Sequence, residues 1–404
     1  MWGVDDGAAE FDDGDFVRAA AGEDSGLIEL AILAESDIDA DFGMAGGERG
    51  RYREDEDGFG ERRVGEAQEM AAHARGYGVN EQHGSSDAGE RRPRHVPVLL
   101  DETLAALDLK PGEVFADLTA GLGGHASRAA RAIAPGGVMI LNDVDSTTLG
   151  QAESRVRQET VDVEVVAIQG NFARCGEAIA SKGLRVDAVL ADLGFSSDQM
   201  DDGARGFSFM REGPLDMRMD PTLSITAKDL VASLPEREIE RILREYGEEP
   251  MARRIARKLA VERAHGPIEK TTQLAEIVRA AVGHLGGGSG GKIHPATRTF
   301  QALRIAVNDE LGVLDALLSA VTRGSRKAGS GSSTEVAWLQ PGARVAVITF
   351  HSLEDRMVKR AFQEWEAAGL WVAHDPAVVT PSEAEVEINP RSRSAKLRSV
   401  RLVG

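Results

Sequence analysis

The 404-residue chain has very little cysteine and no long apolar run, and both scarcities limit what it can be. Its single cysteine, Cys175, excludes an internal disulfide framework and is typical of a reducing compartment. No apolar stretch approaches the ~20 residues that span a bilayer. The acidic N-terminus also lacks the basic-then-apolar pattern of a secretory signal. We therefore expect a cytoplasmic protein with no membrane partner, whose 42% hydrophobic residues allow a sizeable core.

Three chemical signatures are also absent from the sequence. The nine histidines show no metal-ligand spacing, so we predict no metal. His351 follows an apolar run and is a candidate general base, but no nucleophile partner is evident and a structural role at a strand end is more common. The glycine-rich stretch 119–125 is not the GxGxxG pattern expected where a pyrophosphate rests on a helix N-terminus. Its absence disfavours a nicotinamide-dependent dehydrogenase.

The negative charge of the chain is concentrated in one segment. The net charge is −19, which on average disfavours nucleic acid as a partner. Residues 1–94 hold 24 acidic and 10 basic residues, a net of −14, so only −5 remains for residues 95–404. The composition of residues 1–94 predicts a disordered acidic extension or linker, with a partner-docking tail as the alternative. Whole-chain charge therefore says little about what residues 95–404 bind.

The order of apolar segments from residue 95 onward predicts an α/β fold interrupted by helices. We expect parallel strands over 114–118, 138–141, 161–168, 186–191 and 344–350, and helices between them over 98–109, 147–158 and 353–368 and directly after the glycines. Within the interruption we expect a loop over 201–221, helices over 227–234, 236–245, 250–265, 272–282 and 296–318, and glycine-rich linkers over 286–291 and 324–333, the second one flexible. The predicted domains are an acidic extension (1–94), a first core part (95–215), a helical insertion (216–294) and a second core part (295–404).

The expected strand ends carry candidate ligand-binding residues. An acid about 20 residues after a glycine-rich turn commonly hydrogen-bonds a ribose hydroxyl, and Asp143 has this spacing from Gly123 and Gly124. The looser glycine turn suits a nucleoside without phosphates, such as S-adenosylmethionine. Asp192 ends the fourth strand, where it can hold a cofactor or an amine, or cap a helix. Phe172 can lie against an adenine ring or belong to the core.

Two clusters of basic residues are candidates for phosphate contacts. The expected helix 250–265 carries Arg253, Arg254, Arg257, Lys258 and Arg263, of which Arg253 and Arg257 are spaced i,i+4, as are Arg254 and Lys258, so they form a broad basic face. A second cluster near the C-terminus comprises Arg391, Arg393, Lys396, Arg398 and Arg401. Each is equally compatible with an ordinary solvated surface. Two such clusters on an acidic chain favour local contacts with a nucleic-acid backbone.

Seven segments occur together in this order: HVPVLLDETLAAL, DLTAGLGGHAS, DLGFSSDQMDDGARGFSFMREGPLDMRMDP, YGEEPMARRIARKL, KIHPATRTFQALRIAVNDEL, ITFHSLEDRMVKRAF and NPRSRSAKLR. They cover most of residues 95–401, and the third and fifth are the most specific. On these segments the chain resembles the small-subunit (16S) ribosomal RNA cytosine-N4 methyltransferases of the RsmH/MraW type. The resemblance implies a Rossmann-like class I methyltransferase sheet with an inserted all-helical domain, and S-adenosyl-L-methionine as the cofactor.

The resemblance also implies a substrate and a set of site residues. The implied target is the exocyclic N4 of a cytidine in the decoding region of 16S rRNA, so the small ribosomal subunit is the implied partner; a homodimer is left open. The implied cofactor site comprises Gly123, Gly124, His125, Asp143, Phe172, Asp192 and Gln199, of which His125 and Gln199 rest on the resemblance alone. Leu122 replaces a usual basic residue and Asn142 a usual apolar one, which puts a local contact in question rather than cofactor binding.

Asp192 is the candidate catalytic residue for such a transfer. Cytosine N4 is a poor nucleophile because its lone pair is delocalised, and accepting a hydrogen bond from N4–H would localise that pair. Backbone carbonyls over 193–197 are the alternative acceptors. The base must be extruded or unpaired, and Phe195, Phe207 or Phe209 is placed to stack on it or to pack in the core. Competing functions are a methyltransferase on another substrate and a non-catalytic RNA-binding assembly factor.

Overall fold

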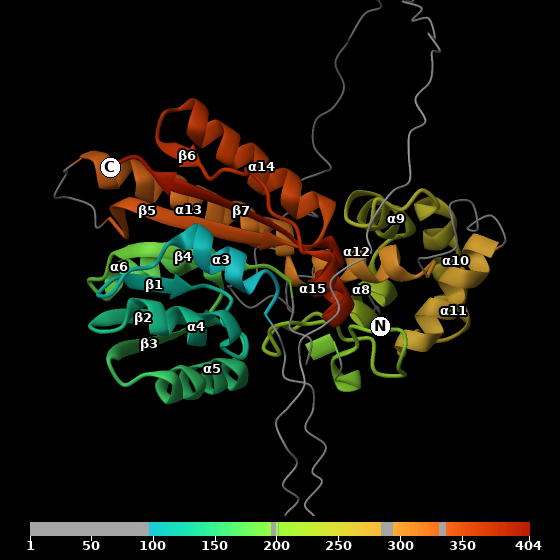
Figure 1. Ribbon diagram of the computed structural model, residues 1–404. Helices are drawn as coiled ribbons and strands as arrows, with labels where there is room; N and C mark the ends of the chain where they lie inside the picture. The colour runs from blue at the N-terminus through green and yellow to red at the C-terminus, as the bar shows by residue number, and fades with distance from the viewer. Residues whose placement is uncertain (1–96, 195–198, 201, 284–293, 331–336) are drawn as a thin grey trace, which may run out of the picture. The chain divides into compact units, whose positions relative to one another are not determined.

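The computed structural model describes residues 97–404 except 195–198, 201, 284–293 and 331–336 (Figure 1). The predicted acidic extension and the predicted linker 286–291 lie outside the described residues. A seven-stranded sheet has the order β3-β2-β1-β4-β5-β7-β6. Its strands are β1 (Val114–Asp117), β2 (Gly137–Asp143), β3 (Val163–Gln169), β4 (Val186–Asp192), β5 (Leu339–Thr349), β6 (Trp371–Ala373) and β7 (Lys396–Leu402).

Strands β1 to β5 are parallel, as the alternation of strands and helices predicts. Sequence reasoning did not locate the two remaining strands, and β7 is antiparallel to both β5 and β6. From β1 the chain adds β2 and β3 on one side and then β4 and β5 on the other. The strand order thus reverses between β1 and β4, and in open α/β sheets ligands bind beyond the carboxyl ends of the strands at this point.

Helices cover both faces of the sheet because successive strand residues point to opposite faces. Phe115 belongs to the core on one face and its neighbour Ala116 to the core on the other. The first core includes side chains of α3 (Leu100–Leu107), α4 (Gly124–Ile133) and α5 (Ser146–Glu159). The second includes α6 (Cys175–Ser181), α13 (Glu310–Ser330) and α14 (Ser352–Ala367). The sheet therefore lies between two layers of helices. Packing on both faces holds the carboxyl ends of its strands in place.

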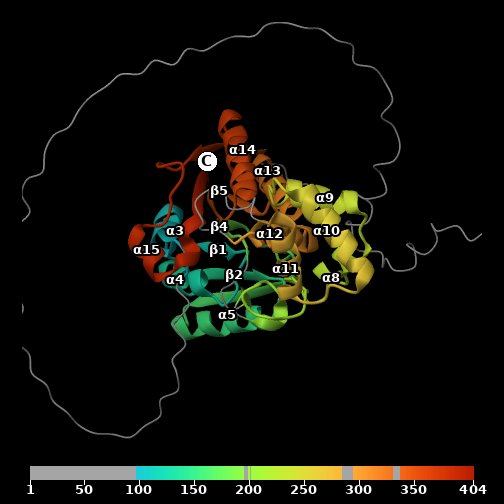
Figure 2. The ribbon, with the colours of Figure 1, turned by 90° about the vertical axis from the view of Figure 1, so that its right-hand side faces the viewer.

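A third hydrophobic core holds the helices between β4 and β5 together. These are α8 (Ala227–Ser233), α9 (Glu236–Glu245), α10 (Ala252–His265), α11 (Thr271–Val282) and α12 (Thr297–Asn308), which lie beside one another in Figure 2. In α9 the buried Ile239, Ile242 and Leu243 have helical spacing, and its charged residues form the other face. None of the described helices is both long and apolar enough to cross a bilayer.

Two sequence-based expectations fail in the segment after residue 295. The single helix expected over 296–318 is two helices, because Asp309 takes left-handed backbone angles (φ 48°) and ends α12. The flexible loop expected over 324–333 is helical through Ser330, where α13 ends; residues 331–333 lie outside the described residues. A Cβ on Gly324 would lie 2.5 Å from Nε1 of Trp338. This glycine therefore serves close packing rather than flexibility.

Candidate active site

Three aspartates end three neighbouring strands at the point where the strand order reverses. Asp117, Asp143 and Asp192 are the last residues of β1, β2 and β4, which lie side by side as β2-β1-β4. Burial raises the pKa of Asp117 to about 7, helped by the charge of Asp143. Sequence reasoning missed Asp117, although its place at the end of an expected strand gave the same signal as Asp192. The carboxyl edge of the sheet thus carries three neighbouring carboxyl groups.

The glycine loop between β1 and α4 serves packing at two positions and leaves a third open. Gly123 has φ 74°, and a Cβ there would lie 2.9 Å from Cα of Ala152 on α5. A Cβ on Gly124 would lie 2.6 Å from Cγ of Pro97. Gly121, with φ 49°, faces open space, since its nearest neighbour would be 3.9 Å away. Close approach of a ligand is therefore possible at Gly121, and the cofactor role of Gly123 and Gly124 remains a prediction.

Asp143 is held by the backbone on both sides of its carboxylate. The N–H of Gly121 donates to Oδ2 at 2.8 Å, and the N–H of Asp145 donates to Oδ1 at 2.9 Å. Burial raises the pKa of this carboxyl, and these two backbone donors oppose the increase. The hydroxyl of Thr148 also hydrogen-bonds this carboxyl and lowers its pKa. A carboxylate has about four acceptor positions, so a position is left for a ligand donor such as a ribose hydroxyl.

Phe172 follows β3 at the same edge of the sheet. It begins a short 3-10 helix, is half-buried and packs against the core on one side. Asn142, the residue that departs from the family pattern, fixes the preceding connection, because its Nδ2 donates to the carbonyls of Ile168 (2.8 Å) and Gly170 (3.0 Å). Gln199 is half-buried and Met200 packs in the helical core. Both alternatives for Phe172 stay open.

Asp192 and His125 face each other across β4 and α4. Nδ1 of His125 lies 3.5 Å from Oδ2 of Asp192, and Nε2 of His125 lies 3.0 Å from the carbonyl of Val98. The other oxygen of Asp192, Oδ1, is buried and has no hydrogen-bond partner among the described residues. Burial, then the charges of Asp117 and Glu354, raises the pKa of Asp192 well above its ordinary value. An unpartnered buried acceptor is costly, so this oxygen is suited to a ligand donor.

The stretch 202–221, part of the most specific segment, is a folded loop tied to both the sheet and the helices. Arg205 lies 3.3 Å from Asp145, which caps α5 beside Asp143, and it also donates to the carbonyl of Met219 (2.9 Å). Asn308 at the end of α12 accepts from Met219 N–H (2.7 Å) and donates to the carbonyl of Met217 (2.8 Å). The loop 202–221 is therefore joined by hydrogen bonds and an ion pair to α5 and α12. Sequence reasoning did not predict these contacts.

A second polar cluster is buried beside the site. Arg304 on α12 donates to both oxygens of Glu310 (2.7 and 2.8 Å), while His351 lies 3.3 Å from Glu354. His351 caps α14, in a capping box with Glu354. Burial raises the pKa of Glu354, but His351 and Arg304 lower it by more, so the carboxylate stays charged. Glu310, His351 and Glu354 have metal-ligand chemistry, yet a guanidinium already supplies the positive charge there.

The aromatic candidates for stacking on a base lie mainly in the helical core. Phe207 is only 6% exposed, and Phe209 stacks on His294 with ring centroids 4.4 Å apart and meets Phe300 edge-on. Phe195 lies outside the described residues, with the backbone of 195–197. Core packing therefore accounts for Phe207 and Phe209.

The two basic clusters differ in how far they are neutralised. On α10, Arg253, Arg254 and Arg257 are exposed, while Lys258 pairs with Glu262 at 2.6 Å. In the second cluster, Arg391, Arg393 and Arg401 are exposed, whereas Lys396 and Arg398 both bind Asp355 at 2.8 Å. The exposed arginines of α10 therefore make the stronger candidate surface for phosphate.

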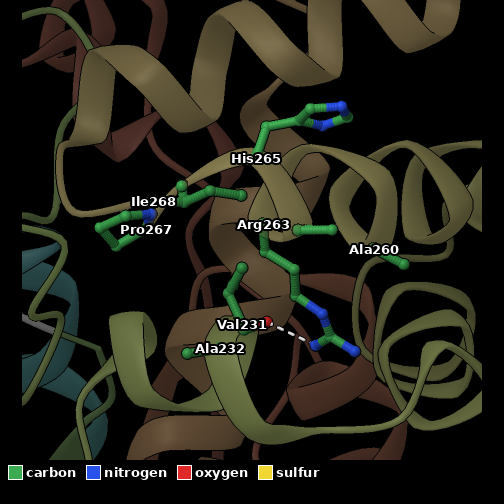
Figure 3. Close-up of a pocket in the computed structure, with 9 residues that line it drawn as sticks. Val231, Ala232, Ala260, Arg263, His265, Pro267 and Ile268 are labelled. Carbon is green, nitrogen blue, oxygen red and sulfur yellow. Dashed lines mark hydrogen bonds between the residues drawn. The ribbon is translucent and has the colours of Figure 1, made fainter.

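A separate pocket of about 530 Å³ lies among the helices between β4 and β5 (Figure 3). None of the residues predicted to hold the cofactor lines it. It is formed by the end of α8, the end of α10 and residues 266–268. The guanidinium of Arg263 points into this space and donates to the carbonyls of Val231 (2.7 Å) and Leu234 (2.6 Å). Arg263 thus satisfies the last carbonyls of α8, which is a structural role.

Comparison with known proteins identifies the family of the chain. The model of the MraW methylase family matches residues 92–403. The protein named ribosomal RNA small subunit methyltransferase H of Symbiobacterium thermophilum is 44% identical over 322 residues, covering 76% of this chain and 96% of its own. The protein of the same name from Acidobacterium capsulatum is 42% identical over 313 residues, covering 76% and 98%. Among solved structures, Aeropyrum pernix fibrillarin bound to S-adenosyl-L-methionine has a TM-score of 0.30 and 12% identity over 74% of each chain. On the family match and these identities, the chain belongs to the MraW methylase family.

Proposed function

We propose that this protein transfers a methyl group from S-adenosyl-L-methionine to the exocyclic N4 of a cytidine in the decoding region of 16S rRNA. The observation that carries the proposal is the pair of acids at the switch point: Asp143 keeps an acceptor position for a ligand, and one buried oxygen of Asp192 has no hydrogen-bond partner within the part of the chain that the structure describes. The family match and the names of the relatives support the same activity. We also propose that the protein acts in the cytoplasm, which a 16S rRNA substrate supports.

The residues that would hold the cofactor are those predicted from the sequence, with Gly121 added. Asp143 accepts the ribose hydroxyls, Phe172 lies against the adenine, and Gly121 lets the ligand approach the backbone closely. Gly123, Gly124, His125 and Gln199 complete the proposed site. The bound cofactor supplies the methyl group as an electrophile on its sulfonium, so the protein has to orient and desolvate the target amine.

Asp192 is the proposed catalytic residue. Its Oδ1 accepts a hydrogen bond from N4–H, which concentrates the lone pair on nitrogen and orients it. The aspartate therefore acts on the part of the substrate that reacts, while the base itself has to leave any helical stack. The exposed arginines of α10 and the pair Arg391 and Arg393 contact the RNA backbone, and we propose residues 216–294 as the RNA-binding insertion.

The decisive experiment is mass spectrometry of small-subunit rRNA from cells with and without the gene. Loss of one methyl at a decoding-region cytidine, restored by the wild-type gene, is the expected result. In vitro, an Asp192→Asn variant should transfer methyl groups at less than a hundredth of the wild-type rate, in line with the ~10²–10⁴-fold contribution of a positioned acid–base group. Unchanged rRNA would indicate another methyl acceptor. Subunit assembly defects that Asp192→Asn rescues fully would indicate a non-catalytic assembly factor.

A further inference from the structure

The pairing of His125 with Asp192 raises a question of proton placement. His125 is 6% exposed, and its Nε2 lies 3.0 Å from the carbonyl oxygen of Val98. A carbonyl only accepts hydrogen bonds, so Nε2 carries a hydrogen. In a neutral ring Nδ1 then has only a lone pair, and it points at Oδ2 of Asp192 from 3.5 Å. Two lone pairs face each other unless a proton is held between them.

The surroundings of Asp192 favour holding that proton. Asp117 faces it from β1, Glu354 from α14 and His125 from α4. Burial and the two acidic neighbours raise the pKa of Asp192 well above its ordinary range. Glu354 stays ionised near neutral pH because His351 and Arg304 hold its pKa low. Its negative charge therefore disfavours ionisation of Asp192.

We infer that His125 and Asp192 share one proton when the site is empty and release it when a cationic cofactor binds. This inference rests on the proposed function. A positive charge placed at the carboxyl ends of the strands replaces the proton electrostatically, because it stabilises the carboxylate form of Asp192. The carboxylate is then ready to act on the target amine.

The proton released in the reaction can return to the pair formed by His125 and Asp192. As the methyl group moves, its bond to sulfur breaks with the electron pair left on sulfur, and the new bond to N4 leaves that nitrogen with a positive charge. The N4–H bond then breaks and its proton goes to Oδ1 of Asp192, from which it is shared with Nδ1 of His125. The site thus keeps one positive charge throughout. His125 is a positioning residue, since it acts through Asp192.

Proton counting by calorimetry tests the inference without any turnover. Binding of S-adenosylmethionine is measured in buffers of different ionisation enthalpy, and S-adenosylhomocysteine, which lacks the sulfonium charge, is the matched ligand. We expect about one proton released per S-adenosylmethionine bound near neutral pH, and a much smaller release for S-adenosylhomocysteine. Asp192→Asn should abolish the difference between the two ligands, and His125→Gln should reduce it.

Asp117 is the competing source of the proton, because its pKa is about 7. An Asp117→Asn variant should keep the proton release if the inference is right. Release that disappears in Asp117→Asn and persists in Asp192→Asn would overturn it. Equal release for the two ligands would do the same, whereas failure of either ligand to bind would refute the proposed function instead.

Nitrogen-15 NMR of the histidines in the ligand-free protein gives a second readout. Nδ1 of His125 should show a protonated-type shift in the wild type and an unprotonated-type shift in Asp192→Asn, where an amide replaces the acid. The exposed His265 serves as the internal control and should not change. An unprotonated-type Nδ1 in the wild-type protein near neutral pH would also overturn the inference.

Discussion

Replacing Asp143 with alanine should abolish binding of S-adenosylmethionine at calorimetric concentrations. The carboxylate accepts the N–H groups of Gly121 and Asp145 and keeps acceptor positions for a ligand. Alanine removes both functions at once. The loop that carries Gly121 loses its tie to β2, and the ribose loses its acceptor.

The magnitude follows from the hydrogen bonds involved. A hydrogen bond to a charged acceptor contributes ~1.5–3 kcal/mol, so losing one ribose contact weakens binding roughly 10- to 150-fold. The loss of order in the loop that carries Gly121 takes the effect beyond this range. Each backbone N–H left without an acceptor should also lower the free energy of unfolding by ~1–3 kcal/mol.

Calorimetric titration at several protein concentrations measures the affinity, and urea unfolding of the same samples measures stability. Asp143→Asn is the matched variant, because it keeps the shape and one acceptor oxygen, and its affinity should lie between those of the wild type and the alanine variant. An alanine variant that stays folded and binds within threefold of the wild type would refute the role of Asp143.

Three further predictions concern stability. Gly123→Ala should cost ~2–4 kcal/mol, because left-handed strain adds to a contact with α5, whereas Gly136→Ala, with φ 81° but nothing within 4 Å, should cost only the ~1–2 kcal/mol of strain; equal losses in urea unfolding would contradict the packing role. Arg304→Met should cost ~3–5 kcal/mol by leaving Glu310 buried without its partner, and a loss under 1 kcal/mol would show that the pair is dispensable. Asp117→Asn should gain stability relative to the wild type as the pH rises from about 4 to about 7, because over this range the folded wild type keeps a proton on Asp117 that the unfolded chain has already released, so that rising pH favours unfolding of the wild type; a flat difference across this range would count against the raised pKa.

Local patterns were enough to locate the strands and the acids at their ends. Asp143 and Asp192 could be singled out because a strand that ends in an acid after a glycine turn is a short-range signal. The helices of the insertion followed from apolar spacing in the same way, as in α9. The flexible loop expected at Gly324 was wrong because flexibility and close packing both favour glycine, and only a contact with a distant residue distinguishes the two.

The sequence by itself determined the order of the five parallel strands and of most helices, the positions of the two key acids and the family to which the chain belongs. Only the tertiary structure decided that β7 pairs antiparallel with β5, that Asp309 divides one helical segment into two, and that Gly324 packs on Trp338. It also decided that His125 faces Asp192. The physical reason is separation along the chain: periodicity and capping act over a few residues, whereas these contacts join distant segments whose meeting depends on how the whole core packs.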